Sequence, residues 1–179
     1  MPEFISDETF DRLLSGGFQH TAWRLESRRS YASDQAGPGY QRWERGEDPE
    51  TDPDRPWCRN IRAQVAAGKR VGRVRVADDP LTLGQAYLLR VGWANVAAGE
   101  DIRHLPRSDA DRLELPQRDF WLFDSRTLLE LHFDTQDGYL GAELVEDPAR
   151  VLTGCQIRDA AWHHAIRYQE FKLRVPSPV

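Results

Sequence analysis

The side chains best suited to metal binding or acid–base chemistry are few in this sequence, and they lie in two places. His163 and His164 are adjacent, and neighbouring residues of a helix point ~100° apart, so the pair cannot hold one metal ion as an i, i+4 pair can. His132, Asp134 and Asp137 surround an expected turn and could serve as an acid and a base. A solvated turn has the same composition, and we favour it. The sequence therefore predicts neither a metal site nor a catalytic residue.

Loops that commonly bind nucleotides or carry a nucleophile are also missing. The sequence has no G-x-S-x-G, no Walker loop and no G-x-G-x-x-G that opens a helix after a strand. Cys58 and Cys155 lie far apart without a C-x-x-C partner, which argues against a zinc site or a disulfide. We expect both cysteines to be reduced thiols in the core, and we predict no cofactor.

Arginine and glutamate occupy alternate positions of two segments that we expect to be strands. Arg24 and Glu26 share one face of the first segment, and Arg73 and Arg75 share one face of the second. If the two strands are neighbours, these side chains form a ladder of cross-strand ion pairs. The ladder is either structural or part of a site for an anion or a partner. Trp121 is most simply a core residue, with ligand stacking as the second interpretation.

Composition limits the classes of function. The 179-residue chain has 24 basic and 29 acidic residues and a net charge of -5, so it lacks the basic footprint expected for direct nucleic-acid binding. Lys69 and Lys172 are the only lysines, and a GC-rich genome explains the arginine excess more simply than phosphate or carboxylate recognition does. No segment resembles a signal peptide or approaches the ~20 apolar residues of a membrane span. We therefore expect a cytoplasmic protein that does not bind membranes.

Hydrophobic periodicity predicts the elements that position these residues. Residues 119–124 (DFWLFD) form an apolar run that must be covered on both faces, which predicts a central strand. Residues 127–133 alternate and predict its half-exposed hairpin partner. The other expected strands lie within 18–31 and at 70–77, 100–105 and 138–145, with a charged connection at 107–116 and a polar loop at 32–56 that is mobile or else a lid. The expected helices lie at 5–14 with Ser6 or Asp7 as the N-cap, at 57–67, and at 80–98 with Asp79 as the N-cap. A last helix runs from 147 to about 173; it would be interrupted, if anywhere, at Thr153-Gly154, and it would bury Leu152, Cys155, Trp162 and Ile166.

These elements predict a single domain of α+β or α/β class, in which helices pack on a mixed sheet with a buried central strand. Its parts are an N-terminal helix and strand (1–31), an acidic loop rich in glycine and proline (32–56) and a core of sheet and helices (57–174). The order strand, helix, strand over 70–105 implies a right-handed crossover and a parallel pair. The helix at 80–98 has no polar stripe, so either its own protein or another must cover it.

Four blocks of sequence, in order, resemble an actinobacterial family of domains of unknown function, number 6879. They are Arg24-Leu25-Glu26 with Tyr31; Arg73-Val74-Arg75-Val76 before Pro80-Leu81-Thr82; Ala98-Gly99-Glu100-Asp101-Ile102; and Asp119-Phe120-Trp121-Leu122-Phe123-Asp124. The resemblance covers most of the chain and implies a regulatory role, because members are often encoded beside helix-turn-helix regulators. The candidate residues for contacts with a ligand or partner are Arg24, Glu26, Tyr31, Arg73, Arg75, Asp119, Trp121 and Asp124.

A second likeness runs from Val71 to Ala165, where the order of elements is similar to one half of a phospholipase-D-like domain. Catalytic members of that superfamily need a histidine, a lysine two positions later and an aspartate; the histidine attacks phosphorus and the lysine stabilises the phosphate charge. Here His132 is followed by Asp134 at the lysine position. The likeness therefore implies the fold without the chemistry.

Taken together, these features lead us to expect a non-enzymatic regulatory or interaction protein. Its partner would be a DNA-binding regulator of the helix-turn-helix type or a second copy of the chain. The alternative is a domain that binds a small molecule or phosphate, with weak enzymatic activity, built from Arg24, Glu26, Arg73, Arg75 and the loop at 32–56.

Overall fold

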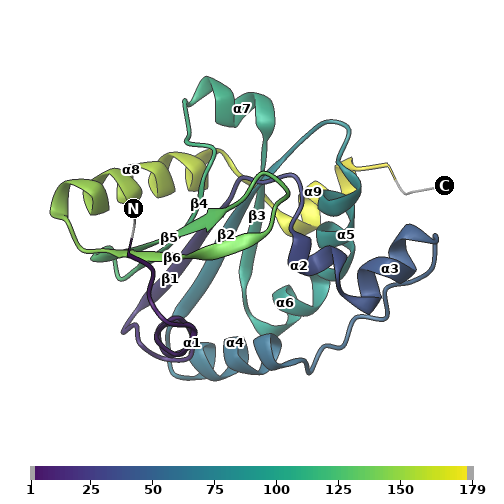
Figure 1. Ribbon diagram of the computed structural model, residues 1–179. Coiled ribbons are helices and arrows are strands. Elements are labelled where there is room, and N and C mark those ends of the chain that lie inside the picture. The colour runs from purple at the N-terminus through teal and green to yellow at the C-terminus, as the bar shows by residue number, and fades with distance from the viewer. Residues whose placement is uncertain (1–2, 177–179) are drawn as a thin grey trace.

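The computed structural model describes residues 3–176, and a seven-stranded mixed sheet forms its centre (Figure 1). The strand order is β6-β5-β4-β1-β2-β3-β7; β1, β2 and β3 are parallel, and the other neighbouring pairs are antiparallel. The predicted single domain and mixed sheet are confirmed. The strands are β1 (Thr21–Glu26), β2 (Arg70–Ala77), β3 (Asp101–Pro106), β4 (Asp119–Phe123), β5 (Thr127–Phe133), β6 (Tyr139–Val145) and β7 (Ile166–Arg167).

Helices cover both faces of the sheet, as the apolar run in β4 requires. All residues of β4 are buried. Trp121 faces a core layer that α1, α4 and α6 cover, whereas Phe120 and Leu122 face the layer beneath α7 and α8. The helices are α1 (Asp7–Leu14), α2 (Ala32–Gln35), α3 (Pro38–Glu44), α4 (Pro56–Ala66), α5 (Leu83–Val91), α6 (Trp93–Ala98), α7 (Arg107–Arg112), α8 (Pro148–His164) and α9 (Tyr168–Arg174).

The predicted parallel pair is β2 and β3, joined through α5 and α6. The helix expected at 80–98 is two helices, and the first begins later than expected. Thr82, not Asp79, is its N-cap, because Thr82 and Gln85 form a reciprocal capping box. The second begins after Gly92, where a Cβ would lie 3.1 Å from the ring of Tyr168, so a larger residue would require this ring to shift.

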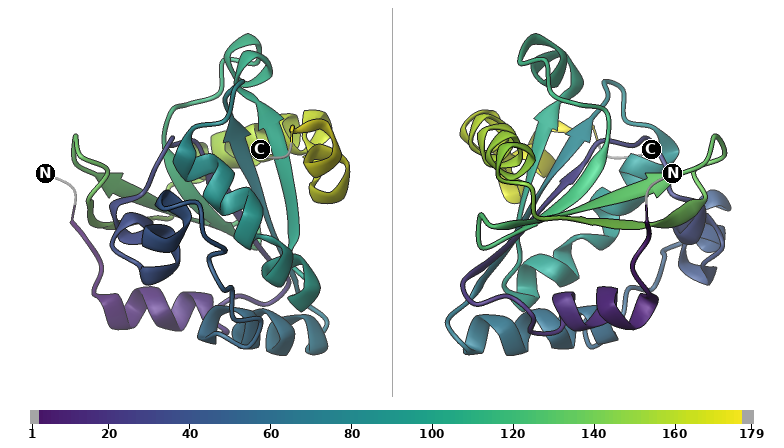
Figure 2. Two further views of the ribbon diagram at one scale, coloured as in Figure 1. Left: turned by 90° about the vertical axis from the view of Figure 1, so that its right-hand side faces the viewer. Right: turned by 60° about the vertical axis from the view of Figure 1, so that its left-hand side comes forward.

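The segment 32–56 is not the unstructured loop that its composition predicts. It contains α2 and α3, and Figure 2 shows them beside α5 on the same side of the sheet as α1 and α4. Tyr40 of α3 is buried, and its ring packs edge-on against Tyr87 of α5 with 5.0 Å between centroids. The charged connection at 107–116 likewise begins with α7.

The C-terminal helix is divided at Ala165 and not at Thr153-Gly154. Gly154 lies within α8, and its missing side chain lets this helix pack closely on Leu128, which a Cβ would approach to 3.0 Å. The chain leaves the helix where Ile166 pairs with β3. Leu152, expected on the buried side, is 59% exposed.

A buried histidine gives the fold a testable pH dependence. The ring of His104 stacks on Phe171 with 4.4 Å between centroids, and burial, followed by the charge of Arg75, lowers the pKa of His104 to about 3. An unfolded histidine titrates near a pKa of ~6.5, so below that pH the unfolded chain binds a proton that the folded chain does not. The group therefore lowers the free energy of unfolding as the pH falls from about 6.5 toward 3.

We expect His104→Phe to flatten this acid-side loss of stability by up to ~1.4 kcal/mol per pH unit. Urea unfolding between pH 7 and pH 5 measures the effect, and His164→Phe, at an exposed position, is the control. Parallel stability curves for His104→Phe and the wild-type protein would contradict the prediction.

Candidate functional site

A buried network of ions crosses the middle of the sheet. In the register of β1 with β2, Arg24 pairs with Arg73 and Glu26 pairs with Arg75, so the four side chains share one face, as the sequence predicts. Glu26 accepts hydrogen bonds from Arg73 Nη1 at 2.7 Å and Arg75 Nε at 2.6 Å, and Arg24 Nη1 lies 3.4 Å away. One carboxylate thus joins three guanidinium groups.

Two further carboxylates complete the network. Glu100 accepts from Arg73 Nε at 2.5 Å and is also held by the side chains of Trp57 and Asn95. Asp119 lies 3.5 Å from Arg24 Nη2 and accepts from the Tyr31 hydroxyl and from Ser27. The network therefore contains the candidates Tyr31 and Asp119, whereas the sequence analysis gave no role to Glu100.

Opposite charges in the network hold Glu26 and Arg24 in their charged forms. Burial alone would raise the pKa of Glu26, but Arg75, Arg73 and Arg24 hold it well below the usual range of a carboxyl. Burial would lower the pKa of Arg24, yet Glu26 and its other acidic neighbours raise it. Three arginines, Arg24, Arg73 and Arg75, balance three carboxylates, Glu26, Glu100 and Asp119, so the network carries no net charge.

A cavity of about 630 Å³ lies over the ion network. Its floor comprises Arg24, Glu26, Arg73, Arg75 and Trp121. Residues of α2, α3 and α5 and the segment after α3 form its walls, so the region 32–56 is part of the site. The aromatic wall residues are Phe10, Tyr31, Trp57 and Tyr87, and polar or charged wall residues are Ser33, Asp34, Arg42, Glu50, Thr51, Asp52, Arg55 and Asn95.

Trp121 is a core residue and part of the cavity floor at once. It is 1% exposed, and the guanidinium carbons of Arg24 and Arg73 each lie 5.6 Å from its ring centroid. Trp57 of α4 packs against it with 5.9 Å between centroids. Both sequence interpretations of Trp121 therefore remain compatible with its position.

Asp119 and Asp124 are the two candidate residues that do not line the cavity, and Asp124 also lies outside the ion network. It ends the β4 strand, and its carboxylate accepts from the backbone N–H groups of Gln19, His20 and Thr21 at 2.7 to 2.8 Å. Burial would raise the pKa of Asp124, but these hydrogen bonds lower it. Asp124 holds the start of β1 against the β4–β5 turn.

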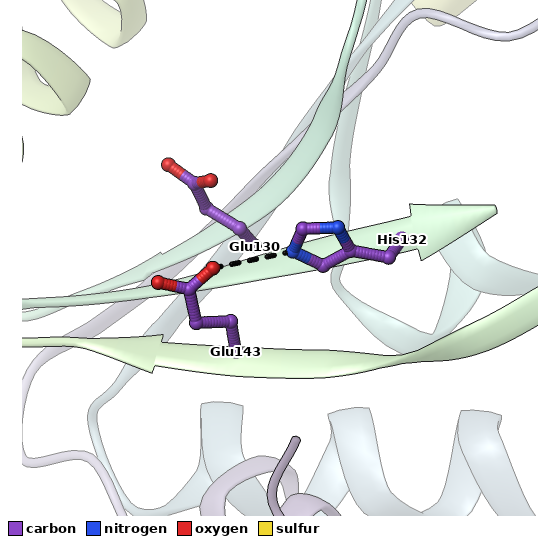
Figure 3. Close-up of side chains that lie close together, drawn as sticks. All are labelled: Glu130, His132 and Glu143. Atoms are coloured by element: carbon purple, nitrogen blue, oxygen red, sulfur yellow. Dashed lines mark ion pairs between the residues drawn. The ribbon is translucent and has the colours of Figure 1, made fainter. Parts of the chain in front are cut away.

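A second cluster of polar groups lies on β5 and β6, away from the cavity. The metal-ligating atoms of Glu130, His132 and Glu143 lie within 4.8 Å of one another, and Figure 3 shows the imidazole of His132 directed toward Glu143. Arg150 of α8 already lies 3.0 Å from both carboxylates. The ring of Phe4 packs on His132 with 5.2 Å between centroids. The two carboxylates thus share Arg150 as a counter-charge, and Phe4 packs against the half-buried imidazole.

The fold is similar to that of a known class of protein. A crystal structure of a phospholipase D family member, Nuc from Salmonella typhimurium, matches with a TM-score of 0.53 and 13% sequence identity over 91% of each chain. At this identity the match shows the fold alone, and it confirms the phospholipase-D-like architecture that the sequence implied. No curated protein matches the sequence. In residues 3–176, no helix has the length and apolarity to cross a membrane.

The chain belongs to the family described as domain of unknown function DUF6879, whose model matches residues 8–173.

Sequence reasoning missed several residues of the cavity. Asp34, Tyr87 and Asn95 come from segments read as a loop or as one apolar helix, and nothing local in the sequence directs them to the ion network. Glu100 had a signal, because it is an acid next to a buried strand whose neighbour carries two arginines.

The network predicts a large effect of a nearly isosteric substitution. Glu26→Gln leaves buried arginines without their shared counter-charge, so we expect the free energy of unfolding to fall by ~3–5 kcal/mol. Urea unfolding measures it. Glu47→Gln removes an exposed partner of Arg45 and should leave stability unchanged. A loss below about 1 kcal/mol for Glu26→Gln would contradict the buried, ionised network.

Proposed function

We propose that this protein is a non-enzymatic regulatory domain that binds a small molecule in the cavity over the ion network. The observation that carries the proposal is the position of the network, since its buried arginines and the Glu26 carboxylate form the floor of a cavity large enough for a ligand. Its volume lies within the ~300–1,000 Å³ typical of small-molecule sites.

Buried ions of this kind contribute little to the stability of a fold. Removing ions from water costs several kcal/mol each, and well-packed apolar residues of similar volume often give equal or greater stability than a buried ion pair. Arg73 and Glu26 are both nearly fully buried and both contact the cavity. A polar ligand gives a reason to keep ions at this place.

The chemistry of the site favours binding over catalysis. The carboxylates of the ion network, Glu26, Glu100 and Asp119, are all paired with arginine, so none is free to act as a base. The similarity to a phospholipase D family member raises phosphodiester cleavage as an alternative, but the Nε2 atom of His132 has no exposed surface. Asp134 stands where the catalytic lysine would be needed.

A protein partner or a second copy is the second candidate role, and it agrees with the regulatory role that the family resemblance implies. The segment 80–98, which we expected to need a cover, gives little support for a partner, because the protein itself covers most of α5 and α6. Leu83 and Trp93 are the large apolar side chains exposed there. The edge strand β6 gives a better surface, since it exposes Tyr139, Leu140 and Leu144.

Closing the cavity should abolish ligand binding. Ser33 lines the cavity and is exposed, so Ser33→Trp fills the cavity without touching the core, and Ser33→Ala is the matched control. In a thermal-shift screen of metabolites, we expect some compounds to raise the Tm of wild-type protein and Ser33→Ala in proportion to concentration. The same compounds should leave the Tm of Ser33→Trp unchanged. Equal shifts in both variants would place the binding elsewhere and contradict the proposal.

The β6 surface makes a separate prediction. If it binds a second copy, Leu140→Glu with Leu144→Glu should convert a dimer to a monomer in analytical ultracentrifugation. Leu173→Glu is the control, because Leu173 is 88% exposed on α9. A wild-type protein that stays monomeric at every concentration would contradict self-association.

A further inference from the structure

We infer that the ligand of the cavity is an uncharged, planar heterocyclic molecule whose edge carries hydrogen-bond acceptors beside a donor, and not a phosphate. This inference rests on the proposed function and narrows it to one chemical class. It follows from the charge balance of the site, from the donors left free on its floor and from the nature of its walls.

The charge balance disfavours an anion. Phosphate and carboxylate sites offer cations that lack a partner, or the N-terminus of a helix. Here the floor arginines are compensated by Glu26, Glu100 and Asp119. On the walls, Arg42 lies 2.8 Å from Glu50. Arg55, also on the walls, donates to Asn95 and to the backbone oxygen of Asp52 and has no carboxylate within 4 Å among residues 3–176, but the carboxylates of Asp34 and Asp52 line the same cavity and offset its charge. A phosphate would therefore add negative charge to a neutral, poorly hydrated network and to walls that already carry carboxylates.

The floor still offers hydrogen-bond donors. Arg73 uses Nε and Nη1, and Arg75 uses Nε and Nη1, so in the part of the chain that the structure describes the Nη2 groups of both donate no hydrogen bond to the protein. The two residues are two positions apart on β2 and line the same cavity. Carbonyl oxygens or ring nitrogens of an uncharged ligand can accept from these groups without disturbing the charge balance.

The opposite wall offers an acceptor. Asp34 lines the cavity and makes no side-chain hydrogen bond or ion pair within residues 3–176. Burial and the nearby charge of Glu26 disfavour the charged form of this carboxyl and raise its pKa, and a ligand N–H that donates to the carboxylate would stabilise that form. A molecule that joins floor and wall therefore needs acceptors on one side and a donor on the other.

The walls favour a flat ligand. Trp57 and Tyr87 are half-buried and line the cavity, and Tyr31 lies beside them. Aromatic walls gain most from an aromatic ligand, through stacked or edge-on contacts. Heterocycles of the nucleobase or flavin type combine such a ring with an edge of acceptors and donors.

Matched pairs of compounds that differ by one phosphate test this class directly. We would titrate adenosine against AMP and riboflavin against FMN by isothermal calorimetry, into wild-type protein, Ser33→Trp and Ser33→Ala. The expected result is that the uncharged member of at least one pair binds at least tenfold more tightly than its phosphorylated partner. Its affinity should change less than threefold between low and high salt, and it should not bind to Ser33→Trp.

Asp34→Asn provides a second readout because it removes one negative charge from the wall and keeps the shape. An uncharged ligand should lose or gain less than tenfold in affinity, whereas an anion should bind more tightly and show a steep salt dependence. If the phosphorylated member binds more tightly and Ser33→Trp blocks that binding, the inference is wrong but the proposed function stands. Absence of binding by either uncharged compound would also overturn the inference. Binding that persists in Ser33→Trp would overturn the proposed function itself.

Discussion

The bridge that Glu26 makes between Arg73 and Arg75 is the interaction on which the rest of the structure depends. It requires β1 and β2 to be parallel neighbours in one register, because a shift by one residue would move every charge to the opposite face. That opposite face is an apolar layer beneath α7 and α8, where an unpaired ion would be very costly. The ion pairs therefore fix the register of β1 and β2, and this register in turn fixes the face on which the charges lie.

The remaining elements are arranged around this constraint. The antiparallel strand β4 brings Trp121 and Asp119 beside β1, and the crossover from β2 through α5 and α6 brings Asn95 and Glu100 to the far side of Arg73. The segment 32–56 then covers the charges from above. Its contact through Tyr40 and the ion pair of Arg90 with Asp48 fix it to α5. A cavity remains because apolar side chains cannot fill the space above these charges without leaving them unsolvated.

Much of this could be predicted from the sequence, because period-two alternation and buried runs are local signals. They located the sheet strands from β1 to β6 and the ladder of arginine and glutamate. The failures were of tertiary origin. The apolar segment divides at Gly92, where Tyr168 packs against the chain, and Ala165 ends α8 because the next residues pair with β3. The composition of 32–56 predicts a loop that is mobile or a lid beside the charged residues of β1 and β2, but only its packing on Tyr87 makes it a wall of the cavity.

The central claim is that the cavity holds an uncharged aromatic molecule above a neutral network of buried ions. The most direct measurement is mass spectrometry of small molecules released by denaturing the protein after purification from its native cells, with Ser33→Trp purified in parallel. The account predicts an uncharged heterocyclic compound, in near-stoichiometric amount, with the wild-type protein and none with the variant. A phosphorylated compound lost from the variant, or the same compounds in both samples, would contradict it.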